Sequence, residues 1–130
     1  MAGRKVFDPD GFKNIEKDGK ITGFSFGFKA QYYRGFTLSI LRKITVNVDG
    51  EEFNREDINI CIHGQTFTLD ECKTVIDSEY RWEFGEFATI IVSKEGGLAA
   101  GKHHLVAGHL IAPSYMPFPI DAQYEADFEI

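Results

Sequence analysis

The residue types best able to perform chemistry in this sequence are cysteine, histidine and closely spaced carboxylates. Cys61 and His63 lie two positions apart in a predicted strand, so their side chains would share one face of it. A metal site needs three or four ligands with supporting hydrogen bonds, and no third ligand accompanies this pair. His103 and His109 also share a face, but six strand positions place them roughly 20 Å apart. The spacing therefore predicts no metal site on this chain.

Glu83 and Glu86 are the carboxylate pair that most suggests acid–base catalysis, because they lie beside Trp82 and Phe84. A glycosidase needs two carboxylates at a fixed separation, and nothing in this segment fixes one. The sequence also lacks a nucleophile elbow, a phosphate-binding loop and a dinucleotide fingerprint. We therefore predict no catalytic residue on this chain, with a small hydrolase that uses the glutamate pair as a less favoured alternative.

Short strands separated by glycine-containing turns must position these side chains. Phe24, Phe26 and Phe28 alternate with Ser25 and Gly27, which predicts a strand over residues 21–29 with three rings on one face. The two small residues leave the opposite face open to close approach by another segment of backbone. Further strands are predicted at residues 38–48, 51–53, 58–62, 87–93, 103–112 and 122–130, with Ile40, Ile44, Val46 and Val48 sharing the apolar face of the second strand.

The turns and the single helix complete a fold prediction. Asp49-Gly50 predicts a tight hairpin turn, and Thr68 with Glu71 forms a capping box that predicts a short helix over residues 69–75. We predict an all-β fold, an antiparallel β-sandwich of jelly-roll-like or immunoglobulin-like type with one short helix. A partly closed barrel is the alternative architecture.

Composition excludes several classes of protein. The 130 residues include 14 Lys and Arg against 20 Asp and Glu, and the net charge of −6 argues against nucleic-acid binding. No apolar run reaches the ~20 residues of a membrane span, and residues 1–10 lack the apolar stretch of a signal peptide. The two cysteines, Cys61 and Cys72, do not form the pattern of a disulfide framework, so we expect both to be reduced thiols. We expect one domain over residues 1–130 in a cytoplasmic protein that binds neither nucleic acid nor membrane.

Aromatic residues are abundant for one small core, with twelve Phe, five Tyr and one Trp. Many of them fall in three irregular segments, residues 32–35, 80–84 and 115–119. This placement favours a subunit interface or the rim of an active site. Two alternatives stay open: plain core packing, and a free-standing carbohydrate-binding module in which Trp82 or a tyrosine stacks on sugar. The candidate interface or rim residues are Tyr32, Tyr33, Arg34, Tyr80, Trp82, Phe84, Tyr115, Met116, Pro117 and Phe118.

Six blocks of sequence, taken in order, carry a resemblance to a known family. They are residues 14–24, 32–35, 46–50, 62–71, 81–85 and 114–119. Each block alone is a weak signal, but together they span nearly the whole chain in one order. On these blocks the chain resembles the beta subunits of C-glycoside deglycosidases.

The resemblance implies a small β-sandwich that assembles with a larger alpha subunit similar to the TIM-barrel sugar isomerases. Such a complex cleaves the carbon–carbon bond between a 3-oxo-sugar and a flavonoid or other aromatic aglycone, by acid–base chemistry assisted by a divalent metal, usually manganese. The metal ligands and general bases of the family belong to the alpha subunit, so the resemblance assigns no catalytic residue and no cofactor to this chain. It implies an accessory subunit, inactive when isolated, in αβ units that form a higher hetero-oligomer.

Overall fold

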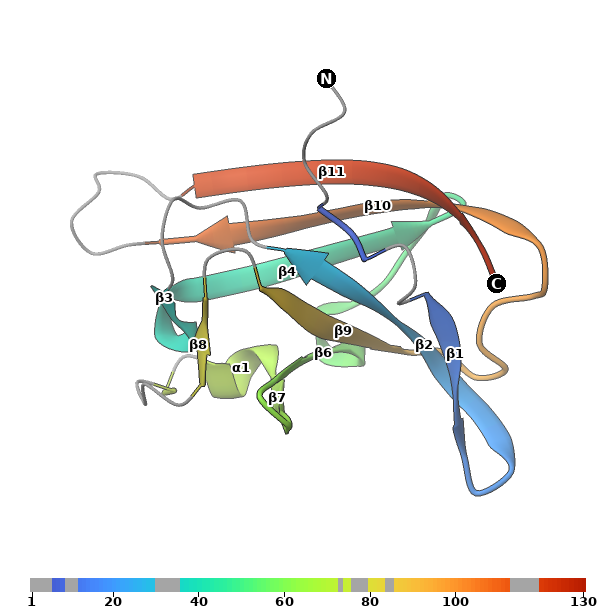
Figure 1. Ribbon diagram of the computed structural model, residues 1–130, viewed down its shortest axis with the longest axis horizontal. Coiled ribbons are helices and arrows are strands. Elements are labelled where there is room, and N and C mark those ends of the chain that lie inside the picture. Colours follow the sequence, from blue (N-terminus) through green and yellow to red (C-terminus); the bar gives the residue numbers. More distant parts are fainter. Residues whose placement is uncertain are drawn as a thin grey trace.

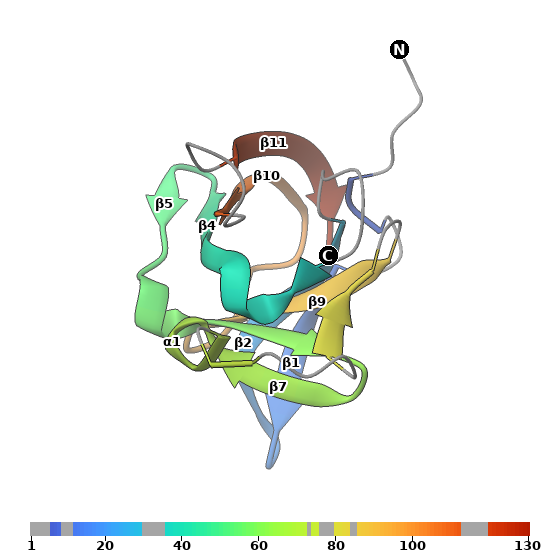
Figure 2. The same cartoon turned by 90° about the vertical axis from the view of Figure 1, so that its left-hand side faces the viewer.

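Two antiparallel sheets are stacked face to face in the computed structural model (Figure 1). The five-stranded sheet has the order β1-β2-β9-β6-β7, the four-stranded sheet has the order β11-β10-β4-β5, and β3 pairs with β8 at one end. The view along the strands shows the two layers with the core between them (Figure 2). The predicted all-β antiparallel sandwich is therefore confirmed. The structure describes residues 6–8, 12–29, 36–72, 74–75, 80–83, 86–112 and 120–130.

The strands β2, β4, β5, β6, β9, β10 and β11 lie close to the predicted ranges, whereas β1, β3, β7 and β8 were not predicted. The helix predicted over residues 69–75 was wrong at its end, because α1 stops at Cys72. The backbone N–H groups of Thr74 and Val75 donate three residues back, to Glu71 and Cys72, as in a tighter turn. In the described part of the chain, the helical segments fall short of the length and hydrophobicity that spanning a bilayer requires. The five-stranded sheet comprises β1 (Lys13–Lys17), β2 (Lys20–Lys29), β6 (Ile58–Ile62), β7 (Gln65–Thr68) and β9 (Phe87–Ser93). The other elements are β3 (Phe36–Thr37), η1 (Leu38–Ile40), β4 (Leu41–Val48), β5 (Glu51–Glu52), η2 (Arg55–Asp57), α1 (Leu69–Cys72), β8 (Arg81–Trp82), β10 (Lys102–Ile111) and β11 (Ile120–Glu129).

Three hairpins are built on the same kind of two-residue turn. Asp18-Gly19, Asp49-Gly50 and His63-Gly64 all have positive φ at both positions, between 50° and 91°. A type I′ turn requires this conformation, and it matches the right-handed twist of the flanking strands. These turns join β1 to β2, β4 to β5 and β6 to β7.

The capping box at α1 forms as predicted. The backbone N–H of Glu71 donates to Thr68 Oγ1 at 3.0 Å, and the backbone N–H of Thr68 donates to Glu71 Oε1 at 2.8 Å. Leu69 and Cys72 are the buried residues of this helix, so it closes one side of the sandwich between β4 and β7. Burial raises the pKa of the Cys72 thiol to about 11, and both cysteines are free.

The prediction that one strand runs from residue 38 to residue 48 was wrong at its start. Residues 38–40 form the 3-10 turn η1, and β4 begins at Leu41. Side chains three positions apart share one side of a 3-10 turn, which lets Leu38 and Leu41 both face the core. Ile40, predicted to face inward, is therefore only partly buried.

The core is a layer of aromatic and branched side chains between the sheets. Phe24, Phe26 and Phe28 are at most 1% exposed, which confirms that the three alternating rings of β2 point inward. The ring centroid of Phe28 lies 6.1 Å from that of Trp82 and 5.7 Å from that of His109. Burial lowers the pKa of His109 to about 4, so this histidine is neutral inside the core.

The small residues of β2 allow close approach on its outer side, as predicted. A Cβ on Gly27 would lie 2.7 Å from Asp8 Cβ, where the N-terminal segment bridges to β2. A Cβ on Gly23 would lie 2.1 Å from the carbonyl oxygen of Val92 on β9. The spacing of β2 and β9 therefore depends on glycine at position 23.

Gly23→Ala should lower the free energy of unfolding by about 2 kcal/mol, because the added methyl group forces the β2–β9 pair apart. Ser93→Ala is the matched control, since Ser93 is exposed directly opposite Gly23 and should change stability by less than about 0.5 kcal/mol. Urea denaturation measures both values. Equal effects of the two substitutions would contradict the steric argument.

Candidate functional site

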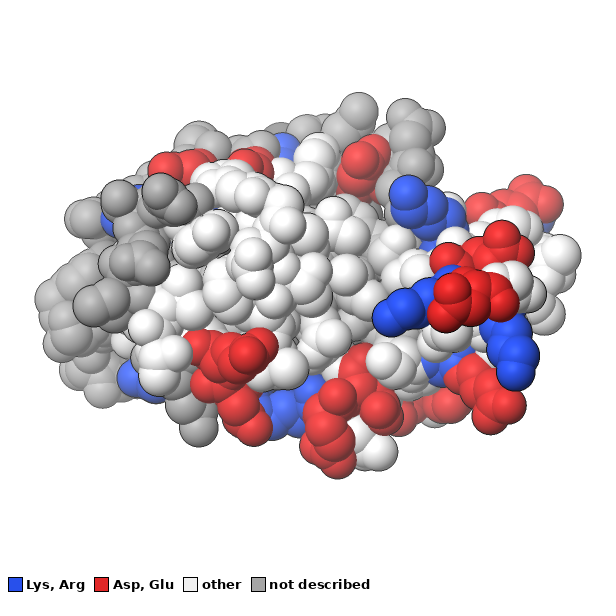
Figure 3. Space-filling model, turned by 90° about the horizontal axis from the view of Figure 1, so that it is seen from below, with Lys and Arg blue, Asp and Glu red and all other residues white. Residues whose placement is uncertain are grey.

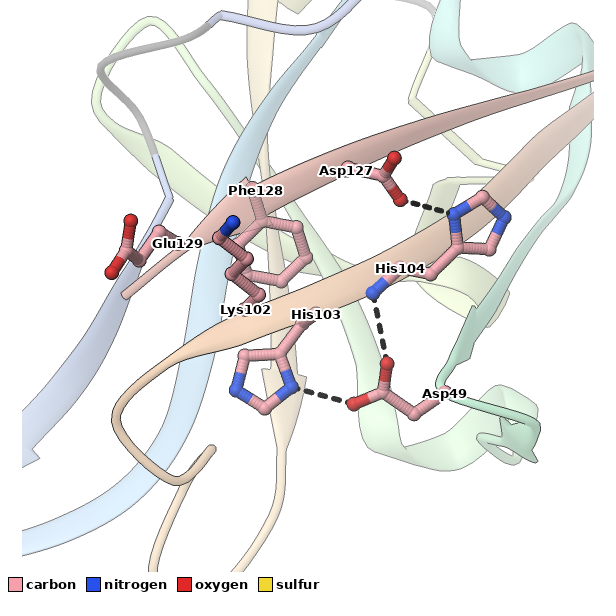
Figure 4. A pocket seen from close by; sticks show the side chains of 7 residues that line it. All are labelled: Asp49, Lys102, His103, His104, Asp127, Phe128 and Glu129. Carbon is pink, nitrogen blue, oxygen red and sulfur yellow. Dashed lines mark hydrogen bonds and ion pairs between the residues drawn. The ribbon is translucent and has the colours of Figure 1, made fainter.

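An open hollow with a volume of about 610 Å³ lies where the four-stranded sheet ends beside the β4–β5 turn. The register of β10 and β11 brings its lining together, since His103 pairs with Phe128 and His104 pairs with Asp127. The turn contributes Asp49 (Figure 4). The complete lining is Asp49, Lys102, His103, His104, Asp127, Phe128 and Glu129.

His103 is held by acceptors at both ring nitrogens. Nδ1 lies 2.6 Å from Asp49 Oδ2, and Nε2 lies 2.6 Å from the carbonyl oxygen of Ala99. A carbonyl and an ionised carboxylate can only accept, so both ring nitrogens must carry hydrogen for both bonds to form. The bond to Ala99 and then the bond to Asp49 raise the pKa of His103. The imidazolium form is therefore favoured.

Asp49 links its turn to β10 through two contacts. Besides its bond to His103, its Oδ1 accepts the backbone N–H of His104 at 2.8 Å. The bond to His103 is the main reason that the pKa of Asp49 is lowered, and the backbone bond adds to it. We call Asp49, Ala99 and His103 the histidine clasp, because it ties the β4–β5 turn to the loop before β10.

The rest of the hollow is aromatic on one side and charged on the other. The His103 ring stacks near Phe128, whose ring in turn stacks on Phe12 with centroids 4.2 Å apart. On the outer side, His104 Nδ1 lies 2.6 Å from Asp127 Oδ1, and this bond raises the pKa of His104. With both nitrogens of His103 occupied, the histidine clasp offers no free base and acts as a structural tie.

The predicted carboxylate pair also forms local structural contacts. Glu86 Oε1 accepts the backbone N–H of Glu83 at 3.2 Å, and Glu86 Oε2 lies 2.8 Å from His63 Nε2. The carbonyl oxygen of Glu86 accepts the indole N–H of Trp82 at 2.9 Å. These bonds fold the segment around Trp82. Within the described part of the chain, no group of three or more His, Cys, Asp or Glu is placed to hold a metal ion.

Two of the ten predicted interface residues lie in the described part of the chain. Trp82 is completely buried, so its ring belongs to the core and offers no stacking platform for a sugar. Tyr80 is partly buried, with its ring centroid 5.3 Å from that of Phe67. The remaining eight fall outside the described residues: Tyr32, Tyr33, Arg34, Phe84, Tyr115, Met116, Pro117 and Phe118.

The described residues that flank the three predicted segments lie at one end of the sandwich. The last residue of β2 is Lys29, and β3 and β8 lie at the same end (Figure 1). Ile111 and Ile120, on either side of the third segment, are paired there. The histidine clasp lies toward the opposite end of β10. The role of the ten residues at an interface or active-site rim stays a prediction.

Sequence reasoning missed the histidine clasp entirely. It identified Asp49 as a turn residue and placed His103 on a strand, but 54 positions separate the two. Only the pairing of β4 with β10 brings them together, through the register that sets Leu105 opposite Val48. No local pattern in the sequence carries that information.

The fold and the site define a small β-sandwich in which His103 with Asp49, His104 with Asp127 and His63 with Glu86 form side-chain hydrogen bonds. Residues 2–115 match the family model described as C-glycoside deglycosidase beta subunit. The chain is 37% identical over 127 residues to the C-glycoside deglycosidase beta subunit of Eubacterium cellulosolvens, an alignment covering 97% of this chain and 85% of that relative. The chain belongs to the C-glycoside deglycosidase beta subunit family, as the sequence blocks indicated. It is a beta subunit of that enzyme system, and a beta subunit implies an alpha partner.

His103→Gln should cost stability in a pH-dependent way. The pKa of His103 is raised in the folded state above its ordinary value of 6.5. Its contribution to the free energy of unfolding is therefore complete below pH 6.5 and is lost as the pH rises through the raised pKa. Asp49 has a lowered pKa, so its contribution is lost only as pH falls below 3.8. The substitution should therefore lower the free energy of unfolding by about 1 kcal/mol at pH 6 and by less at pH 9.

Chemical denaturation of both proteins at the two pH values checks this prediction. His104→Gln is the control, because its ring is more exposed, at 47% against 10% for His103, and should matter less. A loss for His103→Gln that is the same at pH 6 and pH 9 would show that the charged form of the ring contributes nothing.

Proposed function

We propose that this chain is the non-catalytic beta subunit of a complex that cleaves the carbon–carbon bond between a 3-oxo-sugar and an aromatic, flavonoid-type aglycone. The observation that carries the proposal is the similarity to a C-glycoside deglycosidase beta subunit across 97% of this chain. The complex is then a carbon–carbon lyase, and this chain is its accessory part. It stabilises and completes the alpha subunit in the cytoplasm.

We place the reacting groups of the complex in the alpha subunit. That subunit would be a TIM-barrel-like protein with a divalent metal, preferably manganese, which supplies electrophilic assistance to acid–base chemistry. This division is supported by the side chains described above. Both nitrogens of His103 face acceptors, and the Glu86 carboxylate contacts the Glu83 backbone and His63. The αβ units would assemble into a higher hetero-oligomer.

A free-standing sugar-binding module is less well supported. The one tryptophan of the chain is the residue best suited to stack on a sugar ring. Trp82 is 0% exposed and donates its indole N–H to the carbonyl oxygen of Glu86. Exposing this ring would require the surrounding core to open.

Co-expression with its alpha subunit, which we expect to be a TIM-barrel-like protein encoded by a neighbouring gene, should yield a complex that cleaves a 3-oxo-C-glucoside. The isolated beta subunit should show no turnover, and the isolated alpha subunit should be unstable or poorly active. Size-exclusion chromatography follows assembly, and chromatography of the released aglycone follows the reaction. Turnover by this chain alone would overturn the assignment of an accessory role.

The segment 113–119 provides a second test. Tyr115→Ala combined with Phe118→Ala should weaken the complex at least about tenfold, because aromatic residues at subunit interfaces commonly carry more than 1 kcal/mol of binding energy each. Gln123→Ala is the control, since Gln123 is exposed on β11. Titration calorimetry with the alpha subunit gives the affinities. Unchanged affinity of the double variant would remove this segment from the proposed interface.

A further inference from the structure

Among the residues that the structure describes, the outer face of the five-stranded sheet carries no charged side chain on β9, β6 or β7. The chain is 26% charged overall, yet the view of this face shows a broad area without Lys, Arg, Asp or Glu, with charged residues below it and to its right (Figure 3). Solvent-exposed surfaces are normally rich in charged side chains. We call this area the neutral face.

The strand register defines which residues form the neutral face. Residues that alternate with the buried ones point outward, so the inward burial of Phe24, Ile60 and Ile90 determines the outward set. One row across three strands is Ile91, Asn59 and Thr68, and the next is Thr89, Cys61 and Thr66. Phe87 and Ser93 extend the neutral face along β9. Gly23, Ser25 and Gly27 of β2 lie on the same side of the sheet but are buried, so they are not part of it.

The outer face of the four-stranded sheet has a different character. Its outward positions include Lys43 on β4, His104 on β10, and Glu125 and Asp127 on β11. Ion pairs cross it, such as His104 Nε2 to Glu125 Oε2 at 3.7 Å. The two sheets of one chain thus present one charged outer face and one neutral outer face. Loss of charge is the feature that distinguishes the centre of a protein interface from ordinary surface.

The neutral face is large enough to form the centre of a subunit interface. The strands β9, β6 and β7 have seven, five and four residues. At a strand spacing of about 4.8 Å and a rise of about 3.3 Å per residue, their outer face spans roughly 250 Å². A stable interface buries about 800 Å² on each partner. The neutral face would therefore supply about a third of that area, with the remainder from its rim.

We propose that the neutral face is the surface on which the alpha subunit docks, through an uncharged patch rich in apolar and hydroxyl groups. This inference rests on the proposed function, because it takes the alpha subunit as the occupant. Membership of a beta subunit family requires a surface for a different chain. A second copy of this chain is a poorer occupant, since each copy carries a net charge of −6 and two copies repel each other.

Single lysines at the neutral face test the proposal. Thr89 on β9 and Thr66 on β7 are both exposed, so Thr89→Lys and Thr66→Lys place a charge in the neutral face without disturbing the core. Each substitution should weaken binding to the alpha subunit at least about 100-fold, because an unpaired charge would be buried. Gln123→Lys adds the same charge to the outer face of the other sheet and should leave the affinity within about threefold.

Calorimetry against the alpha subunit measures the affinities, and thermal unfolding confirms that each variant folds. Should Thr89→Lys fail to fold, Thr66→Lys at the edge strand decides the matter. Wild-type affinity in a folded Thr89→Lys or Thr66→Lys variant would overturn the proposal. The proposal would also be overturned if sedimentation showed that the wild-type chain forms a dimer, and if these substitutions dissociated the dimer without changing the affinity for the alpha subunit. Failure of wild-type chain to bind the alpha subunit at all would instead refute the proposed function.

Discussion

One apolar layer between the two sheets determines the rest of the structure. The inward rings of β2, with Trp82 and His109 against them, hold the sheets together by excluding water from a continuous core. Because side chains alternate along a strand, committing Ile90 to this layer places Thr89 and Ile91 on the outer face of the sheet. The neutral face and the core are therefore two consequences of the same register.

Strong local signals explain why most of the fold could be predicted from the sequence. Strict alternation marked β2 and β11, and a burial pattern that alternates residue by residue confirms it for β11 from residue 121 onward. Asp49-Gly50 and the Thr68–Glu71 box each carry their own backbone geometry. Weak or absent local signals explain the failures. β1 is short and largely charged, so only its pairing with β2 makes it a strand, and η1 is a turn embedded in an apolar run.

The candidate site was less predictable, because it depends on contacts between distant residues. Asp49, Ala99 and His103 meet only when β4 and β10 pair. Trp82 was predicted to lie at an interface or active-site rim, with core packing as an open alternative; it is completely buried, and the Glu86 carbonyl accepts its indole N–H. Function came from the ordered resemblance to a family rather than from a catalytic motif. That resemblance is consistent with histidines and carboxylates that serve the structure of this chain.

The three two-residue turns divide the sheet pairings into fast and slow ones. The turns close β1–β2, β4–β5 and β6–β7 locally, so these hairpins can form while the rest of the chain is still disordered. The pairings β2–β9 and β4–β10 join residues far apart in sequence, such as Gly23 with Ser93 and Val48 with Leu105. Contacts of such long sequence separation slow folding, because loop-closure entropy is lost before they form. We therefore expect the joining of β9 and β10 to hairpins that already exist to limit the rate at which new subunits become competent to assemble.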